Sequence, residues 1–169
     1  MEGGDAARAH GRWWSENAAD YHAEHGTFLG DSGLRWCPEG LTEDRAGLLG
    51  SVVGCRVLEV GCGAGQGSRW VAQNGGLAVG CDIAEGMLAV GRRLNGTTGV
   101  PVPLVLGDAR HLPFADRSFD VVFTAFGAIP FVPDPEAVHR EVARVLRPGG
   151  RWVFSTTHPM RWVFADDPS

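Results

Sequence analysis

Three acidic residues stand at the ends of short apolar segments of the chain. Glu59 lies in the run 57–60, Asp82 comes 21 residues after Gly61, and Asp108 follows a third apolar segment. Carboxylates at the carboxyl ends of parallel strands point into a common crevice, so these residues predict one ligand site. Asp82 can accept hydrogen bonds from ribose hydroxyls or cap the next helix. Asp108 can accept an amino group of a base or close a turn.

The glycines that follow Glu59 predict a turn between a strand and a helix. Gly61, Gly63 and Gly65 fall at every second position. Glycine permits positive φ and close approach of a ligand, and the amides of the next helix favour electron-rich atoms. The dinucleotide pattern G-x-G-x-x-G fails in both registers, because Gln66 and Ser68 stand where its last glycine would be. A negative Glu59 repels a pyrophosphate and suits a cationic group.

The segment E-x-G-x-G-x-G over 59–65 resembles the first motif of the class I S-adenosylmethionine-dependent methyltransferases. Three further segments are similar to that family in the same order: G-D-A at 107–109, L-P-F-x-D-x-S-F-D at 112–120 and L-R-P-G-G at 146–150. The resemblance covers about 10–165. It implies a small-molecule methyltransferase that uses S-adenosylmethionine, whose ligand carries an ammonium and a sulfonium group.

The resemblance also implies roles for individual residues. Ile83 and Met87 match positions that flank the adenine, Tyr21 lies on an N-terminal helix over the cofactor, and Phe126 lies near the methionine end or the substrate. His158, just after the fifth strand, is the candidate general base, with capping of that strand as the alternative. The cofactor contacts predicted in this way are Tyr21, Glu59, Gly61, Cys62, Gly63, Gly65, Asp82, Ile83, Met87, Asp108, Ala109 and Phe126.

Hydrophobic patterning predicts the elements that position these residues. Strands are expected over 55–60, 77–81, 102–106, 119–124 and 151–156, and helices over 11–26, 42–49, 66–73, 84–94 and 134–146. We expect residues 1–10 to be disordered. Pro103 cannot donate to a ladder, which predicts that the third strand lies at a sheet edge. The resemblance implies an α/β fold with a Rossmann-like, doubly wound, mostly parallel sheet of order 3-2-1-4-5, and the position of Pro103 agrees with that order.

The expected organisation is an N-terminal helical lid and loop over 1–54 and a cofactor-binding core over 55–169. The family sheet has strands six and seven as well, in the order 3-2-1-4-5-7-6. The sequence offers too little chain for them, so we expect a fragment of a longer protein. Strand five would then be an open edge, covered by the tail or paired in a homodimer.

Composition limits the classes of partner. The net charge of −5 and a pI near 5.6 give no basic footprint for nucleic acid, and no apolar run is long enough to cross a membrane. Four cysteines without a C-x-x-C pair predict reduced thiols in the cytoplasm and no metal site. Three alternatives stay open: a nicotinamide oxidoreductase, a non-catalytic S-adenosylmethionine-binding or assembly module, and a cofactor-free structural domain.

Overall fold

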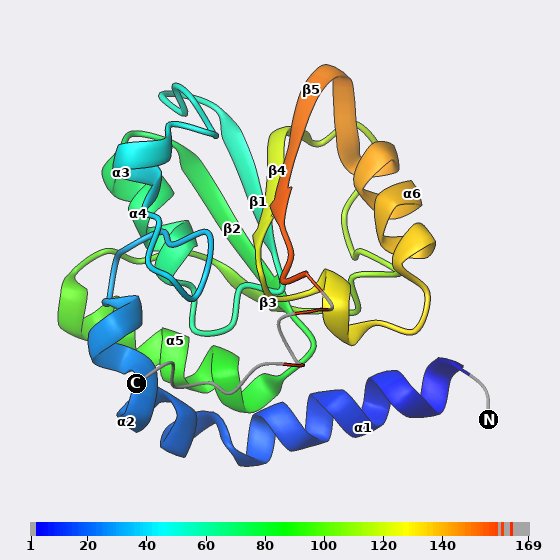
Figure 1. Ribbon diagram of the computed structural model, residues 1–169. Helices are drawn as coiled ribbons and strands as arrows, with labels where there is room; N and C mark the ends of the chain where they lie inside the picture. The colour runs from blue at the N-terminus through cyan, green and yellow to red at the C-terminus, as the bar shows by residue number, and fades with distance from the viewer. Residues whose placement is uncertain (1–2, 159, 161–162, 164–169) are drawn as a thin grey trace.

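The computed structural model describes residues 3–158, 160 and 163, and a five-stranded parallel sheet lies at its centre (Figure 1). The strands follow the order β3-β2-β1-β4-β5, as predicted. Their bounds are β1 (Arg56–Val60), β2 (Leu77–Asp82), β3 (Leu104–Leu106), β4 (Phe119–Ala125) and β5 (Leu146–Ser155). Because all five run in one direction, their carboxyl ends share one edge of the sheet.

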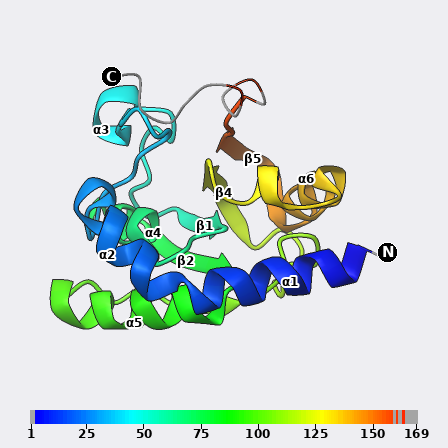
Figure 2. The same cartoon turned by 60° about the horizontal axis from the view of Figure 1, so that its bottom comes forward.

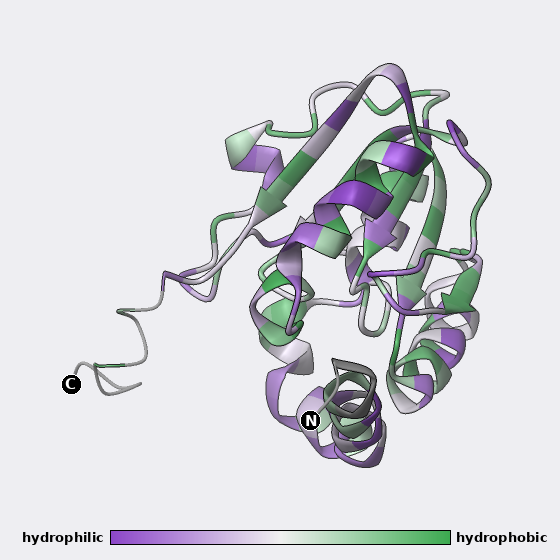
Figure 3. Ribbon diagram, turned by 90° about the vertical axis from the view of Figure 1, so that its right-hand side faces the viewer, coloured by the Kyte–Doolittle hydropathy of each residue, from purple (hydrophilic) through white to green (hydrophobic). Residues whose placement is uncertain are grey.

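The two faces of the sheet carry separate hydrophobic clusters. On one face Val57 and Phe123 pack with Val71 of α4 (Gln66–Gln73) and with Trp36. On the other face the strands pack against α6 (Pro135–Val145), whose Val138, Val142 and Val145 are fully buried. Figure 3 shows hydrophobic residues along the strands and hydrophilic residues on the outer surfaces of the helices. The fold is therefore doubly wound, as expected.

The N-terminal region differs from the prediction. The single helix expected over 11–26 is two helices, α1 (Gly3–Glu16) and α2 (Ala18–Leu29), separated by Asn17. The side-chain and backbone amides of Asn17 both donate to the Trp13 carbonyl, at 2.8 and 3.0 Å, and the Asn17 backbone departs from helical geometry with φ of −96° and ψ of 2°. Residues 3–10, expected to be disordered, form the first part of α1. This helix runs beside α5 (Glu85–Thr98), which supplies the tertiary contacts that the sequence pattern did not show (Figure 2).

The other elements begin close to their predicted positions. α3 (Glu43–Ala46) is short, and a 3₁₀ turn spans Ile129–Phe131. Asp134 caps α6 as predicted, because its carboxylate accepts the Ala137 amide at 3.0 Å. β5 begins directly after α6, five residues earlier than predicted, and its register with β4 shifts between Phe119 and Val121.

The two outer strands correspond to the predicted edges. β3 pairs only with β2, and Pro103 stands just before it, where its carbonyl accepts the Gly80 amide at 3.0 Å. Within the described part of the chain β5 pairs only with β4, and Phe154 is 45% exposed. Pairing of this edge with a second copy stays a prediction. No helix among the described residues is long and apolar enough to cross a membrane.

Candidate functional site

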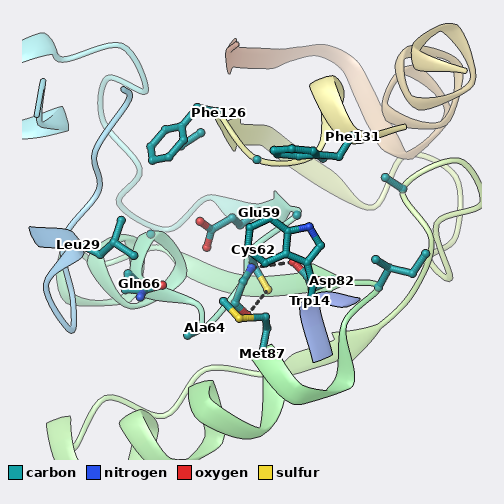
Figure 4. A pocket seen from close by; sticks show the side chains of 18 of the residues that line it. Trp14, Leu29, Glu59, Cys62, Ala64, Gln66, Asp82, Met87, Phe126 and Phe131 are labelled. Atoms are coloured by element: carbon teal, nitrogen blue, oxygen red, sulfur yellow. Dashed lines mark hydrogen bonds between the residues drawn. The ribbon is translucent and has the colours of Figure 1, made fainter. Parts of the chain in front are cut away.

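A cavity of about 590 Å³ lies at the carboxyl edge of the sheet (Figure 4). The ends of β1, β2 and β4 form its floor and α1 and α2 cover it. Its volume lies within the range of about 300–1,000 Å³ that is typical of small-molecule sites. Eleven of the twelve predicted cofactor contacts line it: Tyr21, Glu59, Gly61, Cys62, Gly63, Asp82, Ile83, Met87, Asp108, Ala109 and Phe126.

The glycine turn after β1 needs glycine at each predicted position. Gly61, Gly63 and Gly65 have φ of 65°, 53° and 76°, in the left-handed region that favours glycine. A Cβ on Gly61 would lie 2.8 Å from the Cβ of Ala128. Gly65 does not line the cavity; a Cβ there would lie 2.9 Å from Leu104 at the β3 edge. Gly65 thus starts α4 and packs against the sheet.

Asp82 ends β2 and holds the glycine turn against the start of α5. Its Oδ2 accepts the Gly63 amide at 2.7 Å and its Oδ1 accepts the Ala84 amide at 2.8 Å. Burial raises the pKa of this carboxyl above its ordinary value, although both amides oppose that shift. Each oxygen keeps a further lone pair, so Asp82 can bond the backbone and accept from a ligand diol.

Glu59 is a buried carboxylate beside the same turn. It is 6% exposed, and its Oε2 accepts both the amide and the hydroxyl of Ser68 at 2.6 Å. A Cβ at Gly67 would lie 2.5 Å from Oε1, so only glycine at 67 leaves room for this carboxylate. Burial raises the pKa of Glu59 to about 7. Within the described residues the Oε1 of Glu59 accepts no hydrogen bond, and it is not among the fully buried atoms without a partner. It is therefore available to a ligand cation.

Asp108 is engaged by its neighbour. Arg110 donates to it through its side chain, at 2.6 Å to Oδ2 and 3.0 Å to Oδ1, and through its amide at 2.9 Å to Oδ1. Burial raises the pKa of Asp108, but the Arg110 hydrogen bonds outweigh it and the net pKa is lowered. The turn that the sequence left as an alternative is formed here, and an adenine amino group would share the carboxylate with Arg110.

An aromatic wall closes the cavity opposite the sheet. Trp14 meets Tyr21 edge to face at 5.3 Å between ring centroids and Phe131 at 5.8 Å. The Nδ1 of His10 lies 2.6 Å from the Phe131 carbonyl, which links α1 to the 3₁₀ turn. The helical spacing of Trp14 and Tyr21 indicated one face. The position of Phe131 in the cavity wall was not predictable from a periodic pattern, because Phe131 lies in a short 3₁₀ turn.

Of the two remaining predicted site residues, Phe126 lines the cavity and His158 does not. Phe126 directly follows β4 and has φ of 39°, and its amide donates to the Ser155 carbonyl at 3.1 Å and the Ser155 hydroxyl at 3.0 Å. This turn brings Phe126 to the cavity. His158 is exposed, accepts the Met160 amide at 3.2 Å and does not line the cavity. A catalytic role for His158 stays a prediction.

Comparison with known families identifies the central part of the chain. A family model described as a methyltransferase domain matches residues 58–154, which include the last three residues of β1, Asp82, Asp108, β4 and most of β5. The chain belongs to this methyltransferase family. The matched region contains every predicted cofactor contact except Tyr21, so the family covers the sheet side of the cavity and leaves the helical cover to the N-terminal segment.

Individual relatives agree with the family. The methyltransferase domain is 44% identical over 98 residues to demethylmenaquinone methyltransferase of Corynebacterium kroppenstedtii, covering 58% of this chain and 40% of that protein. It is 41% identical over 116 residues to methyltransferase GfsG of Streptomyces halstedii, covering 67% and 41%. A solved S-adenosylmethionine-dependent methyltransferase from Mesorhizobium loti matches with a TM-score of 0.60 and 33% identity, over 68% and 52%. The chain spans about two fifths of the length of these curated relatives.

Proposed function

We propose that this protein transfers a methyl group from S-adenosylmethionine to a small-molecule acceptor. The observation that carries the proposal is the placement of Glu59 Oε1 and Asp82 beside one glycine turn, inside one cavity of about 590 Å³. Such a cavity offers a carboxylate for a cationic group and a second carboxylate for a diol. The dinucleotide alternative lacks support, because a buried carboxylate at Glu59 disfavours a pyrophosphate.

The residues present fit this cofactor. Asp82 would accept from the ribose hydroxyls, Glu59 would face the ammonium group, and Ile83 and Met87 would flank the adenine. Positive φ at Gly61 and Gly63 leaves the turn without Cβ atoms, so a ligand can approach the backbone. When bound, the cofactor supplies an already activated methyl group. The chain's own contribution is to orient two reactants and exclude water, which can lower a barrier by several kcal/mol.

An apolar acceptor suits the rest of the cavity. The cavity is also lined by apolar residues that are not among the predicted cofactor contacts, including Phe28, Leu29, Pro38 and Pro130. The curated relative from C. kroppenstedtii is named for demethylmenaquinone. It supports the proposal that this chain also methylates a largely apolar small molecule.

The cysteines support a cytoplasmic location, which is part of the same proposal. All four are free thiols, and two of them, Cys62 and Cys81, are buried. Burial raises the pKa of both thiols, to about 12 for Cys81, which keeps them protonated and unreactive. Free structural thiols are typical of a reducing compartment.

Calorimetric titration with S-adenosylhomocysteine tests the cofactor site directly. We expect saturable binding by the wild type and at least about 100-fold weaker binding by Asp82→Ala, because two hydrogen bonds to a charged group are worth roughly 3–6 kcal/mol together. Asp116→Ala is the matched control, since this carboxylate is 72% exposed, pairs with Arg144 and lies outside the cavity. Absence of binding by the folded wild type would overturn the proposal.

A further inference from the structure

His25 is an imidazole in the cavity wall to which neither the family model nor the predicted contacts give a role. It lies on α2, is half-buried and lines the cavity. The His25 ring packs edge to face against the ring of Tyr21, one helical turn earlier, with 4.5 Å between the ring centroids. This contact orients the imidazole. Neither ring nitrogen has a hydrogen-bond partner within the described residues, and neither is buried away from the cavity and solvent.

Most other proton acceptors of the cavity are already engaged. Both oxygens of Asp82 accept backbone amides, and Asp108 is paired with Arg110. The Nδ1 of His10 is bonded to the Phe131 carbonyl. Glu59 has one free oxygen, but in the proposed function that oxygen faces the cofactor's ammonium group. Glu24 of α2 also lines the cavity, as an exposed carboxylate. Among the described residues that line the cavity, His25 is the imidazole whose ring nitrogens have no hydrogen-bond partner, so it is the candidate base for a second reactant.

The position of His25 suits the acceptor end of the cavity. Tyr21 connects it to Trp14, and Leu29 follows it one turn later on the same face of α2. Leu29 and Phe126 lie at one end of the cavity, whereas Trp14 and Phe131 lie at the other (Figure 4). His25 lies on α2 between Tyr21, which contacts Trp14, and Leu29.

We propose that His25 is the general base that takes the proton of a hydroxyl acceptor, such as a phenol or an enol, during methyl transfer. This inference rests on the proposed function. The acceptor's O–H bond breaks and its proton passes to a ring nitrogen of His25. The oxygen uses its electron pair for the new O–CH₃ bond, while the electrons of the C–S bond return to sulfur. The imidazolium then releases its proton to water.

The charged groups around His25 set the conditions for proton transfer. Tyr21 and Glu24 lie on the same helix, Arg35 lines the cavity from the segment that follows α2, and Glu59 lines it from β1. Burial raises the pKa of Tyr21, so this phenol stays protonated and does not compete for the role of base. Histidine is suited to the task because its ordinary pKa lies near neutrality.

Binding of 4-nitrophenol to the protein saturated with S-adenosylhomocysteine tests the role of His25 without turnover. The ionised phenol absorbs visible light, so absorbance reports the proton directly. Slightly below neutral pH, we expect the wild type to bind the phenol in its ionised form, with His25 holding the proton. In His25→Gln and His25→Asn the bound phenol should ionise about tenfold less readily, while S-adenosylhomocysteine still binds.

A second histidine of the same helix provides the control. His22→Gln changes α2 at a position that does not line the cavity, so it should behave as the wild type does. His158→Gln separates the two candidate bases, because a loss of ionisation in this variant would assign the role to His158. Equal ionisation in the wild type and the two His25 variants, loss of ionisation in His158→Gln, or no binding of 4-nitrophenol would overturn the inference and leave the cofactor site standing. Failure to bind S-adenosylhomocysteine would overturn the proposed function itself.

Discussion

At the scale of single residues, the buried Glu59 carboxylate connects ligand binding to stability. Ser68 donates two hydrogen bonds to it, yet burial still raises its pKa from 4.5 to about 7. A raised pKa means that the folded state binds this proton more tightly than the unfolded state. The ionised carboxylate therefore costs stability, and the cost grows as the pH rises from about 4.5 to about 7 and is constant above that range.

We predict that Glu59→Gln stabilises the fold at alkaline pH and weakens cofactor binding. The amide oxygen can still accept from Ser68, while the burial of a charge is avoided. The free energy of unfolding should rise by up to about 3 kcal/mol near pH 8 and change little near pH 4. Urea denaturation at both pH values measures this. An equal gain at the two pH values would show that ionisation of Glu59 is not its cause.

At the scale of elements, glycines allow α1 and α5 to approach closely. A Cβ on Gly86 of α5 would lie 2.1 Å from the Ser15 carbonyl oxygen at the end of α1. A Cβ on Gly11 of α1 would lie 3.2 Å from the Ile83 carbonyl oxygen just before α5. These contacts hold the N-terminal helix, and with it Trp14, over the cavity.

We predict that Gly86→Ala displaces α1 and lowers stability by about 1–3 kcal/mol, because backbone atoms must move to make room. Affinity for S-adenosylhomocysteine should fall with it, since α1 covers the cavity. Gly96→Ala is the matched control in the same helix, because nothing lies within 4 Å of its Cβ. It should stabilise by about 0.4–1 kcal/mol. Thermal unfolding and calorimetry of both variants measure the difference; similar behaviour of the two would contradict it.

A buried arginine joins the loop after α2 to the core. Arg69 of α4 is fully buried, and it donates to the Asp31 carbonyl at 2.6 Å and the Ala64 carbonyl at 2.8 Å. It also reaches Asn95 of α5 at 3.2 Å. The segment that follows the helical cover is thus tied to both helices beside the glycine turn, which fixes the position of α2 relative to the sheet.

At the scale of the whole molecule, the site exists only where two regions of the chain meet. The sheet supplies the carboxylates and the glycine turn, and the N-terminal helices supply the aromatic wall. A ligand that binds between them links the two regions, so its binding energy adds to the stability of the fold.

We predict that S-adenosylhomocysteine at about 100 times its Kd stabilises the protein by roughly 2.7 kcal/mol, which raises Tm by about 5–11 °C. NAD⁺ at the same concentration should leave Tm unchanged, because the turn lacks the dinucleotide pattern and carries Glu59. Differential scanning fluorimetry measures both shifts. A larger shift with NAD⁺ than with S-adenosylhomocysteine would favour an oxidoreductase.

Sequence patterning located the strands, and the resemblance to the methyltransferase family supplied their order. Asp82 and Asp108 were predictable because they stand where locally encoded apolar strands end, and Glu59 because it lies in such a strand just before the three glycines. Pro103 located the edge strand through a purely local property, its missing amide donor. Eleven of the twelve predicted cofactor contacts line the cavity. Gly65 does not, because it packs against Leu104 of β3.

Only the tertiary structure decided the cover of the site and the state of its charged groups. The helicity of residues 3–10 goes with tertiary contacts that no local pattern encodes, because Ala7 is buried in the cavity wall and the Nδ1 of His10 lies 2.6 Å from the Phe131 carbonyl oxygen. The burial that raises the pKa of Glu59, the hydrogen bond from the Gly63 amide to Asp82 and the contact of Trp14 with Phe131 depend on packing between separate segments of the chain. Local sequence fixes which residues end each strand, whereas contacts between distant segments decide which of their atoms remain available to a ligand.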